Sequence, residues 1–113
     1  MKIKRKNEIN EVKNNEFCII HEYLLDDKDI NCVVSEIRGR YPEKGFVVNE
    51  VCKELVYIMN GEGIIGLVGG ETKLQTGDMI ILEPGEKLYW DGNMTMIVSC
   101  TPAWFPEQHK DVN

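Results

Sequence analysis

Apolar and polar positions alternate in short runs along most of this chain. Between Glu54 and Asn93 the runs are interrupted at close intervals by Asn60-Gly61, Gly69-Gly70, Gly77-Asp78, Pro84-Gly85 and Asp91-Gly92. Glycine in such pairs supplies the positive φ angles that tight hairpin turns need. Runs of about five to seven residues with turn signals every ~8–12 residues are typical of an antiparallel sandwich or barrel. The pattern therefore predicts an all-β fold with turns at these pairs.

The runs themselves give the expected strands. We expect strands at residues 31–40, 46–59 (with a bend near 51–53), 64–68, 72–74, 79–82, 87–90 and 94–100. Met79–Leu82 is continuously apolar, which suits a strand buried on both faces. Residues 17–25 fit a strand or a short helix, and residues 1–15 fit a first strand or an ordered tail.

The last segment, Thr101–Asn113, carries two prolines, which forbid a regular central strand there. We expect Trp104 and Phe105 to anchor this tail onto the body. A chain of 113 residues with 42% hydrophobic content is long enough for one core. It therefore predicts a single domain, with a core at about 30–105 and peripheral segments at 1–15 and 101–113.

The charge balance narrows the classes of partner. The formal net charge is −6. Nucleic acids and anionic membrane surfaces bind basic protein faces, so we expect neither as a main partner. No apolar run approaches the ~20 residues that span a bilayer, and the basic start lacks the apolar region of a secretory signal. The four cysteines are scattered without a C-x-x-C pair, which favours buried thiols in a reducing cytoplasm.

Two segments carry a resemblance to a known family. Glu54, six residues and Gly61 match the end of the first cupin motif, and Gly77-Asp78 with Pro84-Gly85 resembles the second, with Pro84 one place late. The likeness covers roughly residues 30–105. It implies an antiparallel jelly-roll β-barrel of cupin type, and small cupins commonly pair, so a homodimer is expected.

The chain departs from the family at the metal ligands. The two histidine positions of the first motif hold Val48 and Glu50, or Val47 and Asn49, depending on the spacer, and the third holds Leu88. Only the glutamate remains. Val and Leu side chains offer no donor to the divalent ions that imidazole and carboxylate groups hold. We therefore expect no metal cofactor in this barrel.

Glu54 is the best candidate for a polar group inside the barrel. A carboxylate in an apolar interior needs a hydrogen-bond partner or takes up a proton. Arg38 or Arg40 is the expected partner. The glutamate serves either a bound ligand or a structural ion pair.

The alternation around the missing third histidine points to an aromatic wall. If Leu88 faces inward, Trp90 does too and Tyr89 faces outward. Trp90 then either packs against a small organic ligand, such as a sugar ring, or fills the core. The methionines at 59, 79, 94 and 96 are expected core fillers. The candidate ligand-binding residues are Glu50, Glu54, Trp90, Met96 and Tyr41.

The sequence leaves three functions open and identifies no catalytic residue. The first is a module that binds a small organic molecule in the barrel without a metal. The second is an enzyme, either a metal-independent sugar isomerase or epimerase, or an oxygenase with an atypical site of Glu50, Cys52, Glu54 and His109. The third is a structural or oligomerisation partner. His109 would matter only if the tail folded over the mouth of the barrel.

Overall fold

The structure, a computed structural model, describes residues 1–113 and consists almost entirely of antiparallel strands. Two short 3-10 helices, η1 (Lys6–Glu8) and η2 (Pro106–Gln108), flank them. The strands are β1 (Asn10–Asn15), β2 (Cys18–Tyr23), β3 (Asn31–Arg38), β4 (Phe46–Asn49), β5 (Lys53–Leu67), β6 (Gly70–Gln75), β7 (Met79–Leu82), β8 (Leu88–Thr101) and β9 (His109–Val112).

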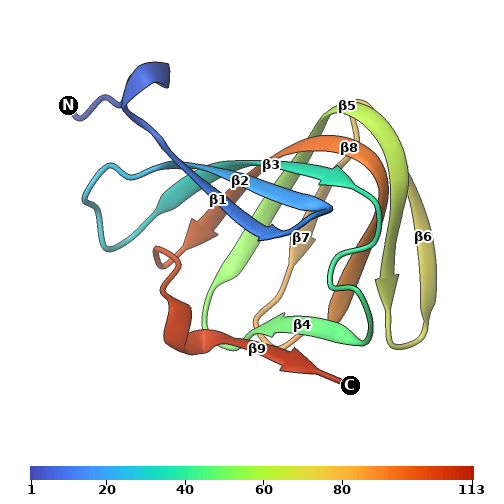
Figure 1. Cartoon of the computed structure of the whole chain (residues 1–113). Helices are drawn as coiled ribbons and strands as arrows, with labels where there is room; N and C mark the ends of the chain where they lie inside the picture. Colours follow the sequence, from blue (N-terminus) through green and yellow to red (C-terminus); the bar gives the residue numbers. More distant parts are fainter.

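Two long strands, β5 and β8, hold the molecule together. They pair along their whole length, from Lys53 opposite Thr101 to Leu67 opposite Leu88. At the end where Lys53 meets Thr101, β7 pairs with β5, and β3 pairs with β8 and is followed outward by β2 and β1. At the end where Leu67 meets Leu88, β6 pairs with β5, and β4 pairs with β8 and is followed outward by β9. The sheet curls into a barrel-like shell (Figure 1). The prediction of an all-β antiparallel barrel is confirmed.

Both long strands bend where the sequence predicted hairpins, so those two predicted turns are wrong. Gly61 (φ +95°) lies within β5 and Gly92 (φ +133°) within β8. A Cβ on Gly61 would come 2.0 Å from the Asn93 carbonyl oxygen, and one on Gly92 would come 2.5 Å from the Gly63 Cα. The glycines permit the close approach of two strands that bend together, and positive φ serves the bend instead of a turn.

The other turn signals are confirmed. Gly69 lies in the tight turn between β5 and β6, where Leu67 pairs with Gly70. Asp78 ends the next turn, and its Oδ2 accepts a hydrogen bond from the Gln75 N–H at 2.8 Å. The predicted bend between β4 and β5 is also present. The ambiguous segment at residues 17–25 forms strand β2.

Strand β7 is an edge strand, and the prediction that both its faces are buried is wrong. It pairs with β5 alone, and Met79 and Ile81 are 59% and 58% exposed. Met59 on β5 is 44% exposed, so it and Met79 are not core fillers. Periodicity could not separate a doubly buried strand from an edge strand whose outer side chains are apolar.

The core lies between the two curled layers. Its most completely buried large side chains are Ile37, Val56, Ile58, Met94 and Met96. The two methionines confirm the prediction for that pair. All four cysteines are free, and all but Cys32 are buried.

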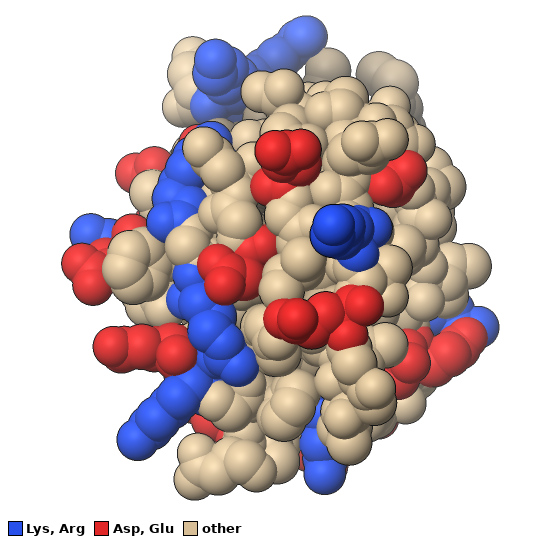
Figure 2. All heavy atoms as spheres, turned by 90° about the vertical axis from the view of Figure 1, so that its right-hand side faces the viewer, with Lys and Arg blue, Asp and Glu red and all other residues tan.

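The surface carries charges of both signs. Figure 2 shows the side of the molecule on the right of Figure 1, where acidic and basic side chains are interspersed and no continuous basic patch forms. The structure contains no helix with the length and apolar character needed to cross a bilayer.

Candidate functional site

A cavity of about 250 Å³ opens between the two layers of the barrel. Most of the residues that line it are hydrophobic. Strands β1, β2, β3, β4, β5 and β8 contribute lining residues, as do the loop after β3 and the C-terminal tail. The cavity thus gathers residues from nearly the whole length of the chain.

The β8 wall follows from the two-residue period of a strand. Leu88 and Trp90 are buried and line the cavity, as expected. Tyr89 faces outward, where its hydroxyl donates to Glu71 Oε2 at 2.5 Å and the Arg40 guanidinium lies 3.9 Å from its ring centroid. The predicted alternation at this strand is confirmed.

Tyr41 forms the adjoining wall. Its backbone N–H and C=O both pair with Trp90, each at 2.8 Å, which fixes the loop after β3 against β8. Burial raises the pKa of the Tyr41 hydroxyl to about 12, and nearby Cys18 and Asp111 add to the shift. The phenol is therefore protonated near neutral pH and can donate a hydrogen bond.

The positions that carry metal ligands in cupins converge on this cavity. Val47, Asn49, Glu54 and Leu88 all line it. This arrangement matches the longer spacer of the first motif. Glu50, the candidate from the shorter spacer, is exposed and does not line the cavity.

These residues do not fit a metal ion. Val47 and Leu88 have no donor atom, and no group of three or more His, Cys, Asp or Glu side chains is placed to hold a metal. The atypical oxygenase site proposed from Glu50, Cys52, Glu54 and His109 is therefore not assembled. The donors that remain suit hydrogen bonding to an organic ligand.

Glu54 projects into the cavity without a cationic partner. Burial raises the pKa of its carboxyl, and the neighbouring side chains of Cys100 and Asn49 offset part of that effect. The Cys100 thiol donates to Glu54 Oε2 at 3.4 Å. A raised pKa favours the protonated acid, which can then donate a proton to a ligand.

The expected arginine partners of Glu54 are engaged elsewhere, so that prediction is wrong. Arg38 donates to the Met94 carbonyl at 2.9 Å, and Arg40 donates to the Pro42 carbonyl at 2.6 Å. Both side chains tie together backbone segments on the outside of the barrel.

The thiols beside Glu54 are not nucleophiles. Burial raises the pKa of Cys100 and of Cys52, and the nearby Glu54 carboxylate raises both further. A thiol with a raised pKa stays protonated at neutral pH, whereas reactive cysteines sit in electropositive surroundings. The sulfur atoms act here as weak hydrogen-bonding groups.

The C-terminal tail folds over the cavity. The buried Gln108 side chain fastens it, because Oε1 accepts hydrogen bonds from the Cys52 N–H at 2.8 Å and the Val51 N–H at 3.1 Å. Strand β9 then pairs with β4, which places His109 opposite Asn49. Trp104 and His109 both line the cavity, so the condition under which His109 would matter is met.

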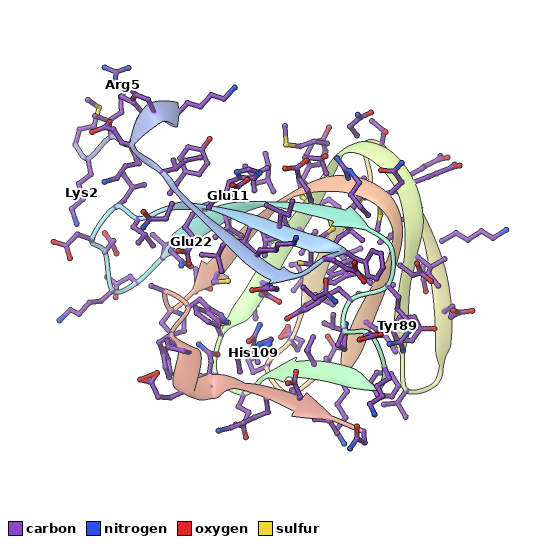
Figure 3. The ribbon with its side chains drawn as sticks, in the orientation of Figure 1. Lys2, Arg5, Glu11, Glu22, Tyr89 and His109 are labelled. Atoms are coloured by element: carbon purple, nitrogen blue, oxygen red, sulfur yellow. The ribbon has the colours of Figure 1, made fainter.

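Asn49 links the tail to the site. Its Oδ1 accepts from Trp104 Nε1 at 3.0 Å and lies 2.9 Å from His109 Nδ1. Burial lowers the pKa of His109, although Asp111 pulls it upward. Figure 3 shows the His109 side chain rising from β9 toward the interior.

Four of the five predicted site residues come together: Glu54, Trp90, Met96 and Tyr41 line one cavity, and Glu50 does not. Sequence reasoning missed Asn49 and Trp104 as site residues, and it made His109 depend on the position of the tail. Asn49 had been identified only as a position where a histidine is missing. His109 reaches the site through the pairing of β4 with β9, and Trp104 through a hydrogen bond from its backbone N–H to Asn31 Oδ1 at 3.2 Å. The sequence has no local signal for either.

The sequence matches no family model and no curated protein, whereas its fold has clear relatives. A Streptomyces Pac13 variant solved with uridine superimposes with a TM-score of 0.89 at 17% identity, over 100% of this chain and 91% of that one. Ectoine synthase from P. lautus gives 0.76 at 21% identity, over 100% and 91%. An RmlC-like cupin from Shewanella frigidimarina gives 0.73 at 15% identity, over 89% and 90%. The chain therefore has the cupin fold, as predicted.

Proposed function

We propose that the protein binds a small, uncharged organic molecule with a planar or sugar ring in the cavity, without a metal ion. The observation that carries this proposal is the lining of the cavity: aromatic side chains, several polar side chains, and no lysine or arginine. Concave, largely apolar sites with a few convergent polar groups are the usual form of small-molecule sites.

The aromatic walls suit a ring. Trp90, Trp104 and Tyr41 present large surfaces from three separate segments of the chain. Aromatic side chains bury large areas and stack on planar or sugar rings, while their polar atoms remain available for hydrogen bonds. Tyr41, Asn49 and Glu54 supply hydroxyl, amide and carboxyl groups around the same space.

The absence of basic side chains selects for an uncharged ligand. Phosphate and carboxylate groups are normally recognised by arginine, lysine or a helix N-terminus, and the cavity lining has no lysine, arginine or helix. Its only imidazole, His109, has a lowered pKa. An anionic ligand would also be repelled by any ionised Glu54. A nucleoside or a free sugar therefore fits better than a nucleotide or a sugar phosphate.

A solved protein of similar fold supports this class of ligand. Pac13, which covers the whole of this chain at a TM-score of 0.89, is described as a nucleoside dehydratase, and several of its variants were solved with uridine. At 17% identity the likeness concerns the fold. It shows that a shell of this shape holds a nucleoside-sized molecule.

The test is a matched pair of ligands. Uridine and uridine 5′-monophosphate share the base and the ribose and differ in the phosphate. We expect uridine or another uncharged nucleoside or free sugar to bind saturably in isothermal titration calorimetry, and the matching monophosphate to bind at least about tenfold more weakly, a difference of ~1.4 kcal/mol. Tighter binding of the phosphate, no binding of any compound in a panel of nucleosides and sugars, or one firmly held transition-metal ion per chain would overturn the proposal.

A pair of tail variants locates the ligand. Trp104 lines the cavity, while its neighbour Phe105 is exposed and does not. We expect Trp104→Ala to weaken binding by about tenfold or more, because an aromatic wall is lost, and Phe105→Ala to leave it unchanged. Equal affinities in the two variants would mean that the ligand binds elsewhere.

A second candidate function is an enzyme of the sugar isomerase or epimerase type. The observation that favours it is that a titratable acid and an imidazole line one cavity: Glu54 and His109 both face it, and His109 Nδ1 lies 2.9 Å from Asn49 Oδ1. Enzymes that transfer protons usually position one acidic and one basic side chain next to the substrate.

A further inference from the structure

The orientation of the Asn49 amide is fixed by its neighbour. Trp104 Nε1–H can only donate, so the Asn49 atom that lies 3.0 Å from it must be the oxygen. Turning the amide over would set two donors against each other. Trp104 therefore decides which end of Asn49 faces the tail.

The same oxygen fixes the tautomer of His109. Its Nδ1 lies 2.9 Å from Asn49 Oδ1, which can only accept, so Nδ1 must carry the proton. A neutral imidazole has one N–H, which leaves the Nε2 lone pair free. Burial lowers the pKa of His109, and Asp111 on the same strand opposes the shift only in part. The ring is therefore a neutral base at pH 7.

An acid lines the same cavity as Asn49 and His109. Glu54, on β5, accepts a hydrogen bond from the Cys100 thiol at 3.4 Å, and burial raises the pKa of its carboxyl. Titratable groups whose environments push their pKa values in opposite directions are the usual signature of an acid and a base acting together. Besides Glu54, the titratable side chains that line the cavity with His109 are Glu22, Tyr41, Cys18 and Cys100.

We propose that His109 Nε2 is the general base and Glu54 the general acid in the enolisation of an uncharged hydroxycarbonyl compound, such as a free aldose or ketose. His109 takes the proton from the carbon next to the carbonyl, and that C–H electron pair forms the C=C bond. The carbonyl oxygen takes the proton of Glu54, giving an enediol. The reverse transfers, to the other carbon or the other face, yield the isomer and restore both residues. This inference rests on the proposed ligand site.

The chain supplies its own control imidazole. His21 is the only other histidine, and its Nε2 lies 2.5 Å from Glu36 Oε2, between β2 and β3. It does not line the cavity. A property that belongs to the site should therefore appear at His109 and not at His21.

The tautomer can be measured without any substrate. In ¹⁵N-edited NMR at pH 7.5, we expect His109 to be neutral with its proton on Nδ1. Trp104→Phe should relax this preference, because the donor that orients Asn49 is gone. A His109 ring with its proton on Nε2, or a doubly protonated ring, would overturn the assignment.

The chemistry is tested by exchange of the carbon-bound proton. The probes are D-xylulose, D-ribose and dihydroxyacetone in D₂O, followed by ¹H NMR. We expect the wild-type protein to catalyse loss of the α-proton signal of at least one probe, and His109→Gln and Glu54→Gln each to slow it by about 10²-fold or more. His21→Gln should exchange at the wild-type rate. Folding of each variant is checked by its thermal midpoint.

The outcomes separate the two proposals. Exchange that persists in His109→Gln, or its absence for probes that bind, overturns the catalytic assignment and leaves the binding proposal standing. If nothing binds, the proposed function fails, and the NMR tautomer still decides whether His109 is held as a base.

Discussion

The interior of this barrel has two regions of opposite character. The packed region, defined by Ile37, Ile58, Ile65, Leu74 and Met94, is buried and lies outside the cavity. The hollow region is the cavity, where Asn49, Glu54 and His109 place polar groups among apolar walls. Strands β5 and β8 contribute side chains to both regions.

The difference shows where stability and function reside along these strands. Close packing of apolar groups stabilises a fold, whereas buried polar groups cost free energy unless they are fully bonded. The Glu54 carboxyl accepts a hydrogen bond only from the Cys100 thiol, at 3.4 Å. Polar groups retained at such a cost, with perturbed pKa values, are typical of a functional site.

The largest effect is expected where the two strands bend. Gly92→Ala places a Cβ against the Gly63 Cα at 2.5 Å, at a φ of +133°. We expect the free energy of unfolding in urea to fall by about 3 kcal/mol or more, from backbone strain and overlap together. Gly69→Ala, which meets nothing within 4 Å, should change it by less than about 1 kcal/mol. Similar values for the two variants would show that the bend does not depend on glycine.

The packed region should respond to loss of volume. Met94 is completely buried, so Met94→Ala should lower the free energy of unfolding by about 2–5 kcal/mol. Met59, 44% exposed on β5, is the matched control, and Met59→Ala should stay within about 0.5 kcal/mol. Urea unfolding of both variants is the measurement. Equal losses would show that Met94 does not lie in a tightly packed part of the core.

Much of the fold could be predicted from the sequence because turn chemistry and alternation are local. Gly69 and Asp78 mark true turns, and the alternation from Leu88 to Trp90 sets the cavity wall. The turns predicted at Gly61 and Gly92 were wrong because a glycine with positive φ occurs both in a hairpin turn and in a bend within a strand. Only the pairing of β5 with β8, a long-range property, distinguishes the two.

The site was predictable only in part for the same reason. Glu54 and Trp90 lie on strands whose inward face the pattern fixes. His109 arrives through the pairing of β4 with β9 and through Gln108, and Trp104 through its hydrogen bond to Asn31, none of which a local pattern indicates. The homodimer and the cytoplasmic location stay predictions, although exposed Leu55, Met79 and Ile81 give the barrel an apolar outer strip.

The attachment of the tail can be tested by itself. Gln108→Ala removes the acceptor of the Val51 and Cys52 N–H groups. We expect a loss of about 1–3 kcal/mol in the free energy of unfolding, the usual cost of leaving buried donors unpaired. Faster amide hydrogen exchange at His109–Val112 should accompany it. Glu107→Ala, at an exposed neighbour, should change neither quantity; if it does, the tail is held by something other than the Gln108 side chain.

The smallest effect, and the one that most sharpens the comparison, belongs to Glu54. Because the folded protein raises the pKa of this carboxyl above the ordinary 4.5, the folded state binds more protons than the unfolded state above that pH. The contribution of Glu54 to the free energy of unfolding is therefore fully present below about pH 4.5, and it is lost as the pH rises through the raised pKa. Glu54→Gln, a neutral isostere of the protonated acid, should change the free energy of unfolding by less than about 1 kcal/mol at low pH and should remove this loss at high pH.

Thermal unfolding from pH 5 to 9 measures the difference between the two proteins. Taking that difference cancels the contribution of His109, whose lowered pKa acts in the opposite sense by weakening the fold as the pH falls below 6.5. Glu50→Gln, at an exposed position four residues earlier, should run parallel to the wild type. If Glu54→Gln instead destabilises the protein increasingly toward high pH, the carboxylate is ionised and stabilised in the barrel. The hollow region would then hold a structural charge, and the contrast with the packed region would no longer identify a site.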